Sequence, residues 1–161
     1  MDPRGAVRLS VERPDSPSAR YCLERYFEEL AARFDGGFDP GRSIPAEPAE
    51  LTPPQGYFVL ATLNDEPVGC GALKCHPTFG EIKRMWVASS VRGLGVGTRI
   101  LVRLEDLARE RRLPLLRLET NKTLTEAQSL YRRHGYREVP AFNDEPYAHH
   151  WFEKVLTPAG A

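Results

Sequence analysis

The sequence has few cysteines, no net charge and no long apolar run. Its three cysteines show no paired spacing, which argues against a disulfide framework or a zinc knuckle and for a reducing compartment. Its 22 basic and 22 acidic residues cancel, so the overall charge favours neither nucleic acid nor a membrane surface as partner. No run approaches the roughly 18 apolar residues of a membrane span, and the first residues do not form a signal peptide. We therefore expect a soluble, cytoplasmic protein.

The length and apolar content suit one compact domain over residues 1–161. The hydrophobic fraction of 41% is enough for a single core. Alternating and helical periodicities predict the order strand, helix, three strands, helix, strand, helix and two strands. The predicted strands are residues 6–12, 57–63, 68–75, 81–88, 115–120, 136–139 and 149–156, and the predicted helices are 17–34, 94–112 and 124–134.

Local signals refine this prediction at four places. Ser16 and Pro17 predict the start of the first helix, and Thr-Leu-Thr-Glu at 123–126 is a capping-box pattern before the third. Residues 35–55 hold five prolines and three glycines without any period. A loop of this length inside a compact domain is commonly functional, so it predicts a lid over a substrate. Residues 157–161 predict a frayed tail.

A glycine-rich turn separates an apolar strand from an amphipathic helix. Its sequence is Arg92-Gly93-Leu94-Gly95-Val96-Gly97-Thr98. Glycines allow a ligand to approach the backbone, and clustered N–H groups at a helix N-terminus bind phosphate or pyrophosphate. Thr98 stands where a dinucleotide fingerprint needs glycine, and no Walker A Gly-Lys-Ser/Thr follows. The turn therefore predicts a phosphate ligand other than NAD or ATP, and the alternative is a tight turn without a ligand.

Three motifs together resemble the GNAT superfamily, the Gcn5-related N-acetyltransferases. Arg92-x-x-Gly95-x-Gly97 is similar to the family's Gln/Arg-x-x-Gly-x-Gly/Ala signature, and Met85-Trp86-Val87 ends the strand before it. Leu130-Tyr131-x-x-x-Gly135-Tyr136 resembles the Leu-Tyr-x-x-x-Gly-Phe motif of the last helix. The resemblance covers about residues 57–156. It implies an α/β (α+β) fold, with a mixed, largely antiparallel, splayed sheet flanked by helices.

The resemblance also implies acetyl-CoA as co-substrate. Its pantetheine arm would lie between the strands at 81–88 and 115–120, paired with backbone groups of Met85 and Val87, and the Met85 N–H would polarise the thioester. Many members carry Asn where this chain has Leu124, which leaves one CoA contact open, with Asn121 nearby. The implied cofactor-binding residues are Met85, Trp86, Val87, Arg92, Gly93, Leu94, Gly95, Val96, Gly97, Thr98, Asn121 and Arg133.

Acyl transfer to an amine requires proton transfers. A lysine-like amine with a pKa of ~10.4 is only about one part in ~2,500 neutral at pH 7. Glu81 is the predicted base, because histone-type members carry theirs on the same strand, and the alternative is a strand-edge carboxylate paired with Lys83 or Arg117. The other candidates for the base are Asp144, Glu145, His149 and Glu119. Tyr131 is the predicted acid for the thiolate, and the alternative for it is a core aromatic.

The predicted function is N-acetylation of a primary amine on a small molecule or a peptide or protein. Residues 34–55 and 141–147 would select the acceptor. The alternative function is a non-catalytic CoA-binding or protein-interaction module on the same fold. No metal is expected, because His149 and His150 are adjacent on a predicted strand and point to opposite faces. A homodimer is common in this family.

Overall fold

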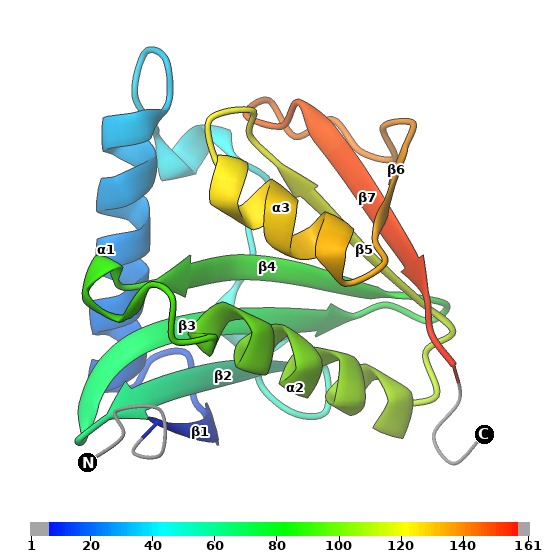
Figure 1. Ribbon diagram of the computed structural model, residues 1–161. Coiled ribbons are helices and arrows are strands. Elements are labelled where there is room, and N and C mark those ends of the chain that lie inside the picture. Colours follow the sequence, from blue (N-terminus) through cyan, green and yellow to red (C-terminus); the bar gives the residue numbers. More distant parts are fainter. Residues whose placement is uncertain (1–6, 158–161) are drawn as a thin grey trace.

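Seven strands form one open sheet in the order β1-β2-β3-β4-β5-β7-β6 (Figure 1). The structure is a computed structural model that describes residues 7–157. The order of helices and strands matches the one predicted from the sequence. The strands are β1 (Val7–Glu12), β2 (Gly56–Leu63), β3 (Glu66–Cys75), β4 (Gly80–Val87), β5 (Leu115–Thr120), β6 (Arg137–Val139) and β7 (His150–Val155), and the helices are α1 (Pro17–Arg33), α2 (Val96–Glu110) and α3 (Thr125–Arg133).

The sheet opens between its two central strands. Every neighbouring pair is antiparallel except β4 and β5, which run parallel. These two strands pair only at Gly80 with Leu116 and at Glu81 with Arg117, and then diverge toward their C-terminal ends (Figure 1). Ligands of open sheets commonly bind beyond the carboxyl ends of parallel strands. The predicted splayed, mixed sheet is therefore confirmed, and the opening is where a site is expected.

A β-bulge interrupts β4 just where the opening begins. Lys83 pairs with Ala72 but Trp86 pairs with Cys70, so one extra residue lies between them on β4. Arg84 has φ of 61°, in the left-handed region that residues with a Cβ rarely adopt. The bulge shifts the alternation of side chains, and the strand therefore changes which face each residue takes.

Helices cover both faces of the sheet and bury two groups of apolar side chains. On the α2 face, Ile100, Leu101 and Leu104 are fully buried in the larger group. On the α1 face, Cys22 and Phe58 are fully buried in the smaller one. Burying a side chain such as Leu contributes about 1.5–3 kcal/mol, so these faces hold the helices firmly against the sheet.

Local sequence signals predict the capping of α1 correctly but not that of α3. Ser16 caps α1 by accepting the Ala19 N–H at 3.2 Å, with proline next to it, as predicted. The capping box predicted for α3 is wrong, because Leu124 is the N-cap and has no side-chain cap bond. The Thr123 N–H and hydroxyl both donate to Asn121 Oδ1 at 2.9 Å instead. This local turn competes with the cap for the same side chain.

The long loop at 35–55 is folded against the domain. It contains two short 3-10 turns, Pro40–Arg42 and Pro48–Leu51. Leu51 is buried, and Glu50 pairs with Lys74 of β3 at 2.6 Å. From residue 158 onward the predicted frayed tail lies outside the described residues. In the part of the chain that the structure describes, no helix is long and apolar enough to cross a bilayer.

Candidate active site

A pocket of about 450 Å³ lies beside the glycine-rich turn. We call it the turn pocket. It is bounded by the C-terminal half of β4, by the start of α2, and by helices α1 and α3. Its lining residues are Tyr26, Glu29, Arg33, Met85, Trp86, Val87, Val91, Arg92, Gly93, Gly95, Val96, Gly97, Thr98, Leu124, Glu126, Ala127, Leu130, Tyr131 and Arg133.

Backbone geometry gives the glycine-rich turn the features of an anion site. Gly93 and Gly95 have φ of 85° and 76°, which only glycine adopts without strain. Gly95 is the N-cap of α2 and offers no side chain to the first amides of the helix. Val96, Gly97 and Thr98 carry these amides and line the turn pocket. Uncapped N–H donors and the positive end of the helix dipole thus meet there, which suits a phosphate group.

Arginine side chains add positive charge at the same pocket. The guanidinium of Arg92 lies 3.3 Å from Glu29 and is half exposed. Arg33 donates to Glu126 at 2.9 Å, and Arg133 lines the wall contributed by α3. A phosphorylated ligand could exchange the exposed ion pair of Arg92 for a charge-assisted hydrogen bond at little cost, since surface ion pairs are weak.

A second, smaller pocket of about 90 Å³ lies in the opening between β4 and β5. We call it the gap pocket. The C-terminal end of α1, the long loop and residues 145–148 border it, and its aromatic wall includes Phe38 and Tyr147, whose ring centroids are 4.8 Å apart. Its lining residues are Tyr26, Leu30, Phe34, Phe38, Ser43, Ile44, Ile82, Lys83, Arg84, Met85, Glu119, Thr120, Asn121, Leu124, Ala127, Tyr131, Glu145, Tyr147 and Ala148.

The two pockets meet in the middle of the molecule. Five residues line both of them: Tyr26, Met85, Leu124, Ala127 and Tyr131. Tyr131 is 5% exposed, and burial raises its pKa above the ordinary phenol value. A ligand held at the turn can therefore place one end beside a second ligand in the gap pocket, with Met85 and Tyr131 at the junction.

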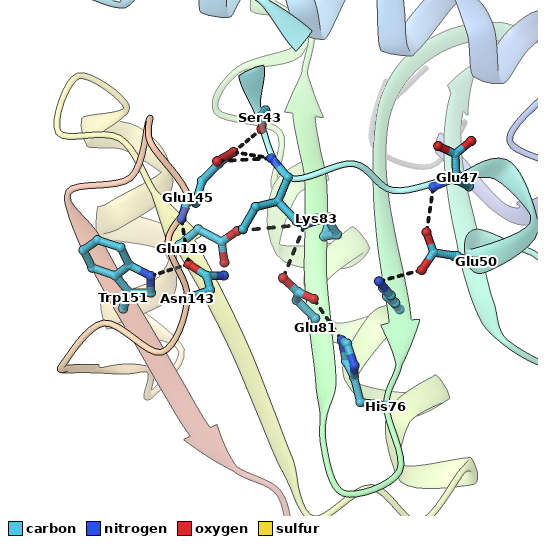
Figure 2. A network of polar contacts seen from close by, with 12 residues as sticks. Ser43, Glu47, Glu50, His76, Glu81, Lys83, Glu119, Asn143, Glu145 and Trp151 are labelled. Atoms are coloured by element: carbon cyan, nitrogen blue, oxygen red, sulfur yellow. Dashed lines mark hydrogen bonds and ion pairs between the residues drawn. The ribbon is translucent and has the colours of Figure 1, made fainter. Parts of the chain in front are cut away.

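Glu119 is the acidic group of β5 that faces the gap pocket. Its Oε1 lies 3.9 Å from Lys83 Nζ, and its buried Oε2 has no hydrogen-bond partner within residues 7–157 (Figure 2). Burial raises the pKa of Glu119 to about 7, against the lowering effect of Lys83 and with the charge of Glu81 adding to the rise. A carboxylate with this pKa exchanges its proton near neutral pH.

Glu81, the base predicted from the sequence, lies next to the gap pocket but does not line it. It is 7% exposed, and its carboxylate is occupied on both sides. His76 Nε2 lies 2.9 Å from one oxygen, and Lys83 Nζ lies 3.3 Å from the other (Figure 2). Lys83 is one of the two partners anticipated for a strand-edge carboxylate, whereas Arg117 pairs with Glu153 at 3.2 Å.

The three other candidates for the base differ in position. Glu145 lines the gap pocket, but its carboxylate accepts from the Ser43 hydroxyl and from the Ile44 N–H at 3.3 Å. Asp144 is exposed and lines neither pocket. His149 also lies outside both pockets, and its Nδ1 accepts the Lys122 N–H at 3.1 Å. Glu119 is therefore the candidate with a free buried oxygen at the gap pocket.

Most of the predicted cofactor residues gather around the turn pocket. Leu94 is absent from its wall, although both of its neighbours in the turn line it. Asn121 lines the gap pocket instead, where its amide donates to the Tyr147 carbonyl at 2.8 Å. The residues that do line the turn pocket are Met85, Trp86, Val87, Arg92, Gly93, Gly95, Val96, Gly97, Thr98 and Arg133.

Two of the lining residues, Tyr26 and Arg84, were not marked as site residues by any motif in the sequence. Tyr26 is one of several aromatic residues on the apolar face of α1, and nothing distinguished it from a core residue. Arg84 lies in a strand beside another basic residue, and the bulge that displays it depends on pairing with β3. Spacing along one strand cannot reveal such a bulge, because it is a property of two strands.

Comparisons with known proteins agree with this geometry. Residues 23–136 match the acetyltransferase (GNAT) family, and the chain belongs to that family. An IAA acetyltransferase of Azospirillum brasilense is 37% identical over 99 residues, 60% of this chain and 63% of that relative. The matches span less than two thirds of the length of the first curated relatives.

Solved structures share the fold at low sequence identity. An acetyltransferase of the GNAT family from Staphylococcus aureus Mu50 superposes with a TM-score of 0.78 at 19% identity, covering 94% of this chain and 100% of that one. A GNAT family acetyltransferase from Elizabethkingia anophelis, with acetyl-CoA bound, gives a TM-score of 0.63 at 19% identity, covering 97% and 100%. The open sheet described above is thus the fold of the family.

Proposed function

We propose that this protein transfers the acetyl group of acetyl-CoA to a primary amine, as an N-acetyltransferase of the EC 2.3.1 class. The observation that carries the proposal is the junction of the two pockets at Met85 and Tyr131. One pocket has the amides and arginines that suit a pyrophosphate, and the other has a carboxylate that titrates near neutrality. Together they provide the two halves of an acyl-transfer site.

The chain offers matching groups for each part of acetyl-CoA. The amides of residues 95–98 and the guanidinium of Arg92 would hold the pyrophosphate. Beyond Glu81, β4 has no partner strand on its β5 side within the described residues, so backbone groups around Met85 and Val87 are free to bind the arm. The bound thioester supplies an activated acyl carbon, and these residues orient it toward the gap pocket.

We assign the base to Glu119. An incoming ammonium must lose a proton before its nitrogen can form the C–N bond, and the C–S bond then breaks to release the thiolate. With a pKa of about 7, Glu119 is about half ionised at neutral pH and is well matched to accept this proton. Lys83 lowers and Glu81 raises the pKa of this carboxyl through their charges. This assignment competes with the sequence-based choice of Glu81, whose oxygens both have partners.

We assign Tyr131 to the leaving group, with a modest contribution. Its hydroxyl belongs to a residue that lines both pockets, so it lies near the point of transfer. Burial raises its pKa, which makes it a weaker acid than an ordinary phenol. Proton donation to a thiolate of pKa ~8.5 is then uphill. A hydrogen bond to the sulfur is the larger part of what this hydroxyl can supply.

Release of free CoA thiol from acetyl-CoA in the presence of a panel of primary amines tests the proposal. Amine-dependent release supports an enzyme. Calorimetric binding of acetyl-CoA without any amine-dependent release would instead support the alternative, a non-catalytic CoA-binding module. Sedimentation of the same preparation tests whether the chain forms the homodimer that is common in the family.

A further inference from the structure

Arg84 is a cation of the gap pocket without an anionic partner. It lines the pocket, and its guanidinium makes no ion pair or hydrogen bond within residues 7–157. Its neighbour Lys83 differs, because that ammonium lies 3.3 Å from Glu81 and 3.9 Å from Glu119. Arg84 is half-buried, and the five donors of its guanidinium are available to a ligand that supplies an acceptor.

The side chain of Arg84 is held in place although it has no polar partner. Its guanidinium lies over the ring of Phe27 at 5.0 Å, and Phe27 stacks on Phe38 at 5.7 Å, which is part of the pocket wall. The residue also occupies the strained backbone position of the bulge, with φ of 61°. Such backbone positions cluster at ligand sites, where surrounding structure holds them. The guanidinium is thus positioned in advance.

Tyr26 adds a second donor to the lining of the gap pocket. Its hydroxyl makes no hydrogen bond to any residue from 7 to 157, and it lines both pockets. Burial raises its pKa to about 12, so the hydroxyl keeps its proton at neutral pH and can donate it in a hydrogen bond. Arg84 and Tyr26 therefore bring N–H and O–H donors to the same cavity, and Glu119 lies on its β5 side.

We propose that the acceptor is a small primary amine carrying a carboxylate or a phosphate on the same molecule, with the anion bound by Arg84 and Tyr26 and the amine directed toward Glu119. This inference rests on the proposed N-acetyltransferase function and names the substrate class. The small volume of the gap pocket, about 90 Å³, favours a compact acceptor. An acceptor with a second positive charge in place of the anion would be repelled by the guanidinium of Arg84.

A matched panel of three amines tests the inference. Propylamine has no anion, β-alanine carries a carboxylate, and O-phosphoethanolamine carries a phosphate. We expect kcat/KM for one or both anionic amines to exceed that for propylamine by about 10- to 100-fold, the value of a charge-assisted hydrogen bond. The better of the two anionic amines identifies the type of anion.

Variants of Arg84 separate anion binding from the chemistry. Arg84→Gln should remove the preference for anionic amines by raising their KM, while propylamine and acetyl-CoA keep their constants within about twofold, because Gln leaves the other contacts in place. Arg84→Lys should restore part of the preference. Arg103→Gln, on α2 and in neither pocket wall, is the matched control and should change nothing.

Three outcomes decide between the hypotheses. The anion subsite is overturned if the wild type uses all three amines with equal kcat/KM, or if Arg84→Gln lowers kcat/KM equally for all three. The acetyltransferase proposal stands in either case. If no amine releases thiol, the proposed function fails instead. The subsite is then decided by thermal-shift titration with β-alanine and O-phosphoethanolamine, which should raise the Tm of the wild type but not of Arg84→Gln. No shift in either protein overturns it.

Discussion

Lys83 of β4 and Glu119 of β5 face each other across the opening of the sheet, with Nζ and Oε1 3.9 Å apart. This is the longer of the two contacts that Lys83 makes, since Glu81 lies at 3.3 Å. The ammonium therefore stabilises the Glu119 carboxylate only in part, and burial outweighs it. A carboxyl with a raised pKa results at the place where we propose that the amine loses its proton.

Glu119→Gln should lower kcat/KM by ~10²–10⁴, the usual contribution of a general base, with little change in acetyl-CoA KM. In the wild type, kcat/KM should rise as the pH increases through about 7, because the base acts when deprotonated. Steady-state rates from pH 6 to 10 measure both effects. Glu81→Gln is the matched comparison, and we expect it to be milder. If Glu81→Gln is the more damaging change, the base is Glu81.

The same substitution should stabilise the fold at alkaline pH. The folded pKa of Glu119 is about 7 and the ordinary Glu value is 4.5, so the folded state binds more protons between these values. Glu119 therefore contributes to the free energy of unfolding below about pH 4.5, and this contribution is lost as the pH rises to 7. The loss is at most about 3 kcal/mol. Gln stays neutral throughout. Urea unfolding at pH 8 should therefore favour Glu119→Gln, and a less stable variant would contradict the assigned shift.

Gly95→Asp should abolish acetyl-CoA binding. A Cβ added at Gly95 would meet no heavy atom within 4 Å, so crowding at that atom is not the cause. A negative charge at the N-cap of α2 would instead repel the pyrophosphate and occupy the free amides. Gly37→Asp is a matched control, because Gly37 has φ of 83°, meets nothing within 4 Å and lies outside both pockets. Calorimetry showing equal affinities for the two variants would refute the anion site.

Tyr131→Phe should reduce kcat by less than Glu119→Gln does and leave acetyl-CoA affinity nearly unchanged. The ring packs near Tyr136 and Phe152, with centroids 5.8 and 6.2 Å away, and Phe retains that packing. Only the hydroxyl is lost, and its raised pKa makes it a poor acid. Single-turnover rates with a thermal melt on each protein measure the effect. An inert variant would return Tyr131 to the role of a core aromatic.

Glu145→Gln should loosen the long loop and raise the KM of the amine more than that of acetyl-CoA. Its carboxylate accepts from Ser43 and from the Ile44 N–H, and so fixes the loop over the gap pocket (Figure 2). Glu50→Gln is the matched control, because Glu50 ties the same loop to Lys74 on β3, outside the wall of either pocket. Equal changes in both KM values would argue against a lid.

Helix and strand order was predictable because the signals are local. The first helix begins at Ser16 and Pro17 and ends before Gly36 and Gly37, which both have positive φ. The hairpin between β2 and β3 turns at Asn64 and Asp65, which occupy the left-handed region as such turns require. The glycine-rich turn was equally predictable from the sequence, since Gly93 and Gly95 adopt the positive φ that glycine permits.

The gap pocket was less predictable, because it depends on how separate strands meet. Glu81 and Glu119 both lie on strands at the opening, and alternation alone does not say which of them reaches the cavity. Lys83, one partner of Glu81, was anticipated from the sequence, but His76 reaches the other carboxylate oxygen only because β3 and β4 pair. Asn121 likewise belongs to a local turn and to Tyr147, 26 residues away, rather than to the turn pocket.

The bulge at Arg84 divides β4 into two segments, in which the side chains alternate between the faces of the sheet out of step with each other. Before it, Glu81 and Lys83 share a face with Ala72. After it, Trp86 takes that same face although it follows Lys83 by three positions, and Met85 packs against the opposite core. Deleting Arg84 would leave one residue between Lys83 and Trp86, just as one residue lies between Ala72 and Cys70, so Lys83 and Trp86 would keep their shared face while β4 lost its bulge. Such a deletion would therefore show what the bulge contributes, because it removes the left-handed position and the Arg84 side chain while the rest of β4 keeps its faces.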